Sequence, residues 1–81
     1  MSHTPHELAE EFPQHVDVMH RLKLADAHFA NLFDAYHEVN RAVHRAETRV
    51  DALDDAAEDE LRRKRMQLKD QIWAKLAQEP V

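Results

Sequence analysis

The distribution of helix-breaking residues constrains this chain more than any other feature. Its 81 residues include no glycine, and the three prolines are Pro5, Pro13 and Pro80. Residues 14–79 therefore contain neither of the two residue types that most strongly oppose a helix interior. Ala, Leu, Glu, Arg and Lys are abundant and β-branched residues are sparse, which argues against a sheet. The sequence predicts an all-α protein.

Apolar residues recur at heptad spacing after Asp26 and predict a long helix. One set is spaced by seven residues and the other fills the interleaved positions of a coiled-coil seam: Phe29, Tyr36, Val43 and Val50, then Leu32, Val39, Ala46 and Leu53. Asp26 can accept hydrogen bonds from the free amides at the start of this helix. We expect the helix to extend from Asp26 through all four heptads.

A second apolar stripe follows an acidic interruption, and we place a turn there, near residues 54–58. Asp55 and Glu58 have the spacing of a capping box, so the next helix should run from about Ala57 to Gln78. An antiparallel fold at this gap brings the two stripes into register: Leu53 beside Leu61, Val50 beside Arg65, Ala46 beside Leu68, Val43 beside Ile72, and Val39 beside Leu76. The expected architecture is a coiled-coil-like antiparallel helical hairpin over residues 26–79.

Residues 1–25 are expected to form a short N-terminal helical segment. Thr4-Pro5-His6-Glu7 has the capping-box pattern with proline at the first helical position. Phe12-Pro13 should interrupt that helix, because a residue before proline is disfavoured in the helical region. A second piece would run from Pro13 to about Lys23. The sequence leaves open whether the two pieces are separate helices or one kinked helix.

Self-association is expected because a chain this short buries a small core and has no cysteine to reinforce it. In the predicted register, apolar residues at the start of the long helix extend past the partner helix, and a second stripe lies beside the core stripe of the later helix. The predicted interface consists of Phe29, Leu32, Phe33, Tyr36, Met66 and Trp73. The N-terminal segment, a second copy or both would cover it, giving a dimeric helix bundle with a tetramer as the alternative.

The sequence predicts neither an enzyme nor a metal or cofactor site. There is no cysteine, Ser2 is the only serine, and no glycine-rich loop exists to hold a phosphate. Among the seven histidines, His37 and His44 lie about 10 Å apart along one helix at 1.5 Å per residue, too far to share an ion. A metal site shared between two chains stays open.

Basic residues suggest RNA contact as an alternative function. The candidates are Arg41, Arg45 and Arg49 on the first helix, and Arg62, Arg63 and Arg65 on the second. The net charge of -5 opposes nucleic-acid binding. Acid-to-base pairs at i, i+4 are also expected to neutralise the second cluster: Glu58 with Arg62, Asp59 with Arg63, and Glu60 with Lys64.

The chain resembles the YdcH-like family of small bacterial proteins of unknown function over about residues 15–77. The residues that carry the resemblance are His20-Arg21-Leu22-Lys23, Asp26, His28-Phe29, Leu32-Phe33, Tyr36-His37-Glu38-Val39-Asn40, Glu47, and Arg65-Met66-Gln67-Leu68-Lys69-Asp70-Gln71-Ile72. The resemblance implies a cytoplasmic bacterial protein with a helical hairpin. It supplies no catalytic or binding residues, and the first dozen residues of this chain are peculiar to it.

The leading functional hypothesis is a protein-protein interaction or scaffolding module that self-associates through its helical faces and has a further, unidentified protein partner. No apolar run approaches the roughly 20 residues that span a bilayer, and the N-terminus lacks the layout of a secretory signal. A cytoplasmic location is therefore expected, with no membrane partner.

Overall fold

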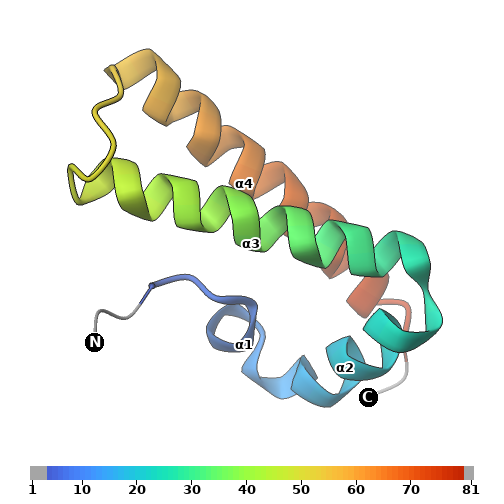
Figure 1. Cartoon of the computed structure of the whole chain (residues 1–81). Helices are drawn as coiled ribbons and strands as arrows, with labels where there is room; N and C mark the ends of the chain where they lie inside the picture. The colour runs from blue at the N-terminus through green and yellow to red at the C-terminus, as the bar shows by residue number, and fades with distance from the viewer. Residues whose placement is uncertain (1–3, 80–81) are drawn as a thin grey trace.

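A computed structural model describes residues 4–79 of the protein and is helical almost throughout (Figure 1). Its elements are α1 (Leu8–Glu11), the 3-10 turn η1 (Pro13–His15), α2 (Val16–Ala25), α3 (Ala27–Glu47) and α4 (Asp55–Leu76). Helices α3 and α4 run antiparallel and pack against each other, while α1 and α2 lie below them (Figure 1). The predicted all-α fold and its helical hairpin are confirmed.

The N-terminal segment consists of two separate helices, which settles the alternative left open by the sequence. Helix α1 begins at Leu8 and not within the predicted capping box, because His6 has a φ of 63° and so leaves the right-handed helical region. Phe12, just before Pro13, has φ −130° and ψ 63°, which ends α1 as expected. We call residues 4–25 the N-terminal arm.

Helix α3 begins as the sequence predicts. The side chain of Asp26 accepts a hydrogen bond of 3.2 Å from the amide of Phe29, the third residue of the helix. The buried face follows the heptad pattern through its first three repeats and includes Phe29, Leu32, Tyr36, Val39, Val43 and Ala46. The coiled-coil-like stripe is therefore present, but it is shorter than expected.

A left-handed residue ends α3 one heptad early. Arg49 has a φ of 66°. The amide of Val50 donates to the carbonyl of Arg45 at 2.9 Å, and the amide of Arg49 donates to that of Ala46 at 3.2 Å. These two bonds form a Schellman motif, which satisfies carbonyls at the helix end and turns the chain. Glycine usually occupies the left-handed position, so its absence from the sequence concealed this helix end.

The predicted turn is consequently wrong in its position. The connection spans residues 48–54, where Val50 and Leu53 are exposed and lie outside any helix. Helix α4 is capped by Asp54, whose side chain accepts from the amide of Ala57 at 2.8 Å, one residue before the capping box expected at Asp55. The fourth heptad was a coincidence of spacing.

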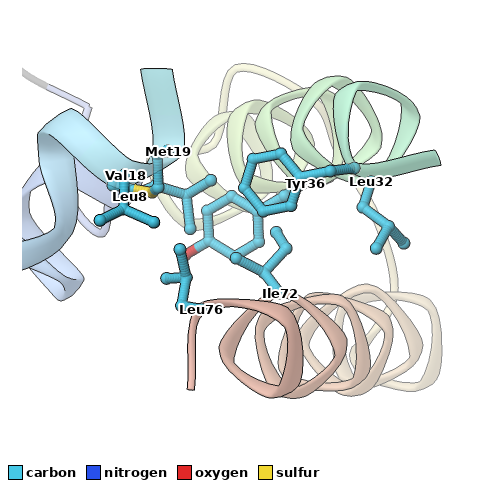
Figure 2. Packing of buried hydrophobic residues seen from close by; sticks show 8 residues of the cluster. Leu8, Val18, Met19, Leu32, Tyr36, Ile72 and Leu76 are labelled. Carbon is cyan, nitrogen blue, oxygen red and sulfur yellow. The ribbon is translucent and has the colours of Figure 1, made fainter. Parts of the chain in front are cut away.

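The earlier turn shifts α4 toward the start of α3, so the predicted pairing between the helices is also wrong. Arg65 lies beside Asn40 and donates to its side-chain oxygen at 3.0 Å, whereas the prediction placed it beside Val50. Near the open end, Lys75 binds Asp26 at 2.9 Å. The core cluster combines three parts of the chain: Leu8, Val18 and Met19 from the arm, Phe29, Leu32 and Tyr36 from α3, and Ile72 and Leu76 from α4 (Figure 2).

Phe29 is expected to anchor this cluster, because its side chain is fully buried at the start of α3. Replacing Phe29 with alanine removes a large ring from a packed site and should lower the free energy of unfolding by about 3 kcal/mol. Chemical denaturation of the two proteins measures the difference. An unchanged denaturation midpoint would contradict the burial of this ring.

Arg49 offers a second test, because a residue with a Cβ atom is disfavoured in the left-handed conformation. Substitution by glycine should raise the free energy of unfolding by about 0.5–1 kcal/mol, the relief of that conformation minus the extra entropy of glycine in the unfolded chain. The matched control is Arg49→Ala, which removes the same side chain but keeps the Cβ atom and should give no gain. Equal melting temperatures for Arg49→Gly and Arg49→Ala would contradict this account of the turn.

Candidate interaction surface

Two buried polar side chains of α3 fix the N-terminal arm to the hairpin. The hydroxyl of Tyr36 donates to the carbonyl of His6 at 2.6 Å, and the side-chain amide of Asn40 donates to the carbonyl of Pro5 at 2.8 Å. Asn40 is 1% exposed, and its oxygen also accepts from Arg65 of α4. One amide thus connects the arm, α3 and α4. Sequence reasoning missed this role of Asn40, which directly follows the seam residue Val39 but is not itself a seam position.

Charged contacts surround these buried bonds. Lys69 binds Glu11 of the arm at 2.7 Å, and Nδ1 of His37 lies 2.8 Å from Glu7. The hydrogen bond from Lys69 lowers the pKa of Glu11. The hydrogen bond from Lys75 likewise lowers the pKa of Asp26, the residue that joins arm and hairpin. Both carboxylates therefore stabilise the fold at pH values above their ordinary pKa. This contribution is lost as the pH falls through their lower pKa values in the folded protein.

Half of the predicted interface is buried in the core of the single chain, which corrects the expected surface. Phe29 and Tyr36 are fully buried and Leu32 is 8% exposed, all within this one chain. Phe33 is partly buried, and the ammonium group of Lys23 lies 4.2 Å above the centre of its ring. These residues extended past the partner helix only in the incorrect register. They belong to the chain's own core and its edge.

Met66 and Trp73 remain at the surface, where they are 57% and 46% exposed on one face of α4. Phe12 of the arm stacks on the Trp73 ring, with ring centres 5.6 Å apart and planes 12° apart. His15 meets the same ring edge-on, with centres 5.5 Å apart. We call Met66, Trp73 and Phe12 the α4 surface.

An open groove of about 420 Å³ lies beside Trp73 on the α4 surface. Aromatic, polar and charged residues line it together: Glu11, Phe12, Pro13, Gln14, His15, Lys69, Asp70 and Trp73. Lys69 is already bound to Glu11, whereas no ion pair to Asp70 occurs within residues 4–79. The groove therefore offers apolar contact area with one free carboxylate at its margin.

Carboxylates and polar groups engage most of the arginines that suggested RNA binding. Arg62 contacts three acids, Glu47, Glu58 and Asp59, at 3.0 to 3.2 Å, and its hydrogen bond to Glu47 raises its pKa. The remaining pairs are Arg63 with Glu60, Arg45 with Asp51, and Arg65 with Asn40. The expected pair of Glu58 with Arg62 is confirmed. The other two are wrong, because Asp59 binds Arg62 and Glu60 binds Arg63 at i, i+3.

Arg41 and Arg49 have no ion pair with any residue from 4 to 79. Over the same span, no group of three histidine, aspartate or glutamate side chains is placed to hold a metal ion. Helices of the described part of the chain are also too short or too polar to cross a membrane. The arrangement can thus provide apolar contact area and charged margins.

Fold and surface together define a small all-α protein: an antiparallel helical hairpin closed by an N-terminal arm. The chain belongs to the protein family of unknown function DUF465, whose model matches residues 29–76, more than half of the chain. This is the YdcH-like family, so the resemblance noted in the sequence is confirmed. The matched residues correspond to the α3–α4 hairpin, and the arm precedes them. No curated protein and no solved structure matches the chain significantly.

Tyr36 provides a test of how the arm closes on the hairpin. Burial raises the pKa of Tyr36 from its ordinary value of 10.0 to about 12. Tyr36 ionises more readily in the unfolded chain than in the folded protein. Its contribution to the free energy of unfolding should therefore be constant below pH 10 and fall by about 2–3 kcal/mol as the pH rises from 10 toward 12. Tyr36 is the only tyrosine, so the absorbance of tyrosinate reports its ionisation directly.

The matched variant is Tyr36→Phe, which keeps the ring but cannot ionise. It should lose about 1 kcal/mol at neutral pH with the hydrogen bond to His6, and it should lack the tyrosine-dependent fall in stability. Ionisation of Tyr36 at its ordinary pKa in the folded protein would show that the arm leaves the hydroxyl accessible to water.

Proposed function

We propose that this chain is a small protein-protein interaction module that associates with further copies of itself through the α4 surface. The supporting observation is the placement of Trp73, a large aromatic ring that is 46% exposed on a folded chain with a complete core of its own. Tryptophan is among the residues most enriched at the energetic centres of interfaces. Met66 adds an adaptable apolar side chain on the same helix face.

The contacts around Trp73 favour a role in binding. Phe12 covers one face of the ring and His15 meets it from the side, so its orientation is already restricted before any partner arrives. A side chain held in this way loses less conformational entropy on association. The groove beside it could admit apolar side chains of a second copy.

The RNA-binding alternative gains no support from the arrangement of charges. Arg62 and Arg63, at the centre of the basic cluster, are occupied by carboxylates of the same chain. Binding phosphates there would require those pairs to separate, in a protein with a net charge of -5. We therefore favour apolar association over nucleic-acid contact.

Charge substitution at Met66 tests the proposal. The mass of the wild-type protein in solution should rise with concentration, and Met66→Glu should weaken association at least about ten-fold by placing a carboxylate in the apolar contact. Sedimentation equilibrium measures both. Because Trp73 is the only tryptophan, its fluorescence should shift toward shorter wavelengths with concentration in the wild type.

The matched control is Leu24→Glu, the same type of substitution at a residue that is 89% exposed on α2 and is not part of the α4 surface. It should associate through that surface as the wild type does. A wild-type protein that stays monomeric at every concentration would refute the proposal, as would equal weakening of association by Leu24→Glu and Met66→Glu.

A further inference from the structure

The joint between the arm and the hairpin consists of a single residue. Helix α2 ends at Ala25 and α3 begins at Ala27, leaving only Asp26 outside the helices, with φ −132° and ψ 105° (Figure 1). We propose that Asp26 is a hinge through which two copies of the chain exchange arms. In the exchanged dimer α2 and α3 form one straight helix, and each arm covers the hairpin of the other copy.

The backbone of Asp26 takes part in the hydrogen bonding of both helices. The amide of Asp26 already donates to the carbonyl of Leu22 at 2.8 Å, and the carbonyl of Asp26 already accepts from Ala30 at 3.0 Å. Straightening the joint would pair the amides of residues 27–29 with the carbonyls of residues 23–25. Alanine, the strongest helix former, lies on both sides of Asp26, and residues 14–79 contain no glycine or proline.

The bent form depends on the side chain of Asp26. It caps α3 through the amide of Phe29 and also binds Lys75 at the far end of α4. The cap on Phe29 requires the extended backbone at residue 26. The bond to Lys75 requires the present position of the Asp26 side chain beside the end of α4. The side chain of Asp26 therefore contributes strongly to the free-energy difference between the bent and the straight form.

The contacts that close the arm can be made by either copy. Each of them joins a residue before the hinge to one after it: His6 to Tyr36, Pro5 to Asn40, Glu11 to Lys69, and Phe12 to Trp73. Exchange preserves all of these contacts and changes only which chain supplies the arm, which is why it is a low-cost route to a dimer. Arm exchange shares with the proposed function only the second copy as partner, and it does not require contact between the α4 surfaces of the two copies.

Substitutions at the hinge test the exchange. Asp26→Ala removes the cap and the bond to Lys75 and favours a straight helix, so the dimer dissociation constant should fall at least about ten-fold after the protein is unfolded and refolded at high concentration. Asp26→Asn is the matched control: asparagine caps helices as well as aspartate does and loses only the charge that faces Lys75, so this variant should change the dissociation constant less than Asp26→Ala does. An Asp26→Ala protein that stays monomeric, with only a lower melting temperature, would overturn the proposal.

A charge exchange shows whether arms are in fact traded. Glu11→Lys and Lys69→Glu, each made in the Asp26→Ala background, both replace the attraction between residues 11 and 69 by repulsion. In a mixed dimer with exchanged arms, each arm meets a hairpin of opposite charge, so both attractions return. After joint refolding of one tagged and one untagged variant, mixed dimers should exceed the statistical proportion and melt at a higher temperature than either variant alone.

Mixed dimers at or below the statistical proportion would show that each arm stays on its own hairpin. Adding Met66→Glu to both chains separates this result from the proposed function. Association through the α4 surface would then be lost, whereas arm exchange would persist.

Discussion

The structure depends on how the arm closes over Tyr36. An antiparallel pair of helices has one contact face, and the stripe from Phe29 to Tyr36 is wide enough that α4 alone cannot cover it. The arm provides Leu8, Val18 and Met19 for the remaining side (Figure 2). Burying the Tyr36 ring also removes its hydroxyl from water, and the carbonyl of His6 supplies the hydrogen bond that makes this burial tolerable. Core packing and arm position are thus set by the same side chain.

The fold class could be predicted from the sequence because helix propensity and the heptad pattern both point to helices over residues 14–79. The position of the turn could not. Val50 and Leu53 continue the heptad spacing beyond the point where Arg49 turns the chain, and arginine carries none of the signal that glycine would give at a left-handed position. The predicted pairing of the two helices was wrong for the same reason, because a misplaced turn displaces every residue pair along a hairpin.

The candidate surface was predictable only in part. Spacing on α4 correctly separated Met66 and Trp73 from the core stripe, and both side chains are exposed. The other interface residues were predicted wrongly because of the arm. Its hydrogen bonds to α3 use the backbone carbonyls of Pro5 and His6, and every residue type has such a carbonyl. The same limit applies to Asn40: its amide satisfies partners that are distant in the sequence, and only the folded arrangement brings them together.

The connection at residues 48–54 also orders events during synthesis. It brings Arg62 to Glu47 across 15 positions, whereas Glu11 and Lys69 are separated by 58. Closing the shorter loop costs less entropy, so α3 and α4 can pair soon after both have left the ribosome. The arm is made first, and we expect it to pack last, since Ile72 and Leu76 complete the surface on which it rests. Until then the nascent chain carries an uncovered apolar arm, which is the period in which a neighbouring chain or a chaperone can reach it.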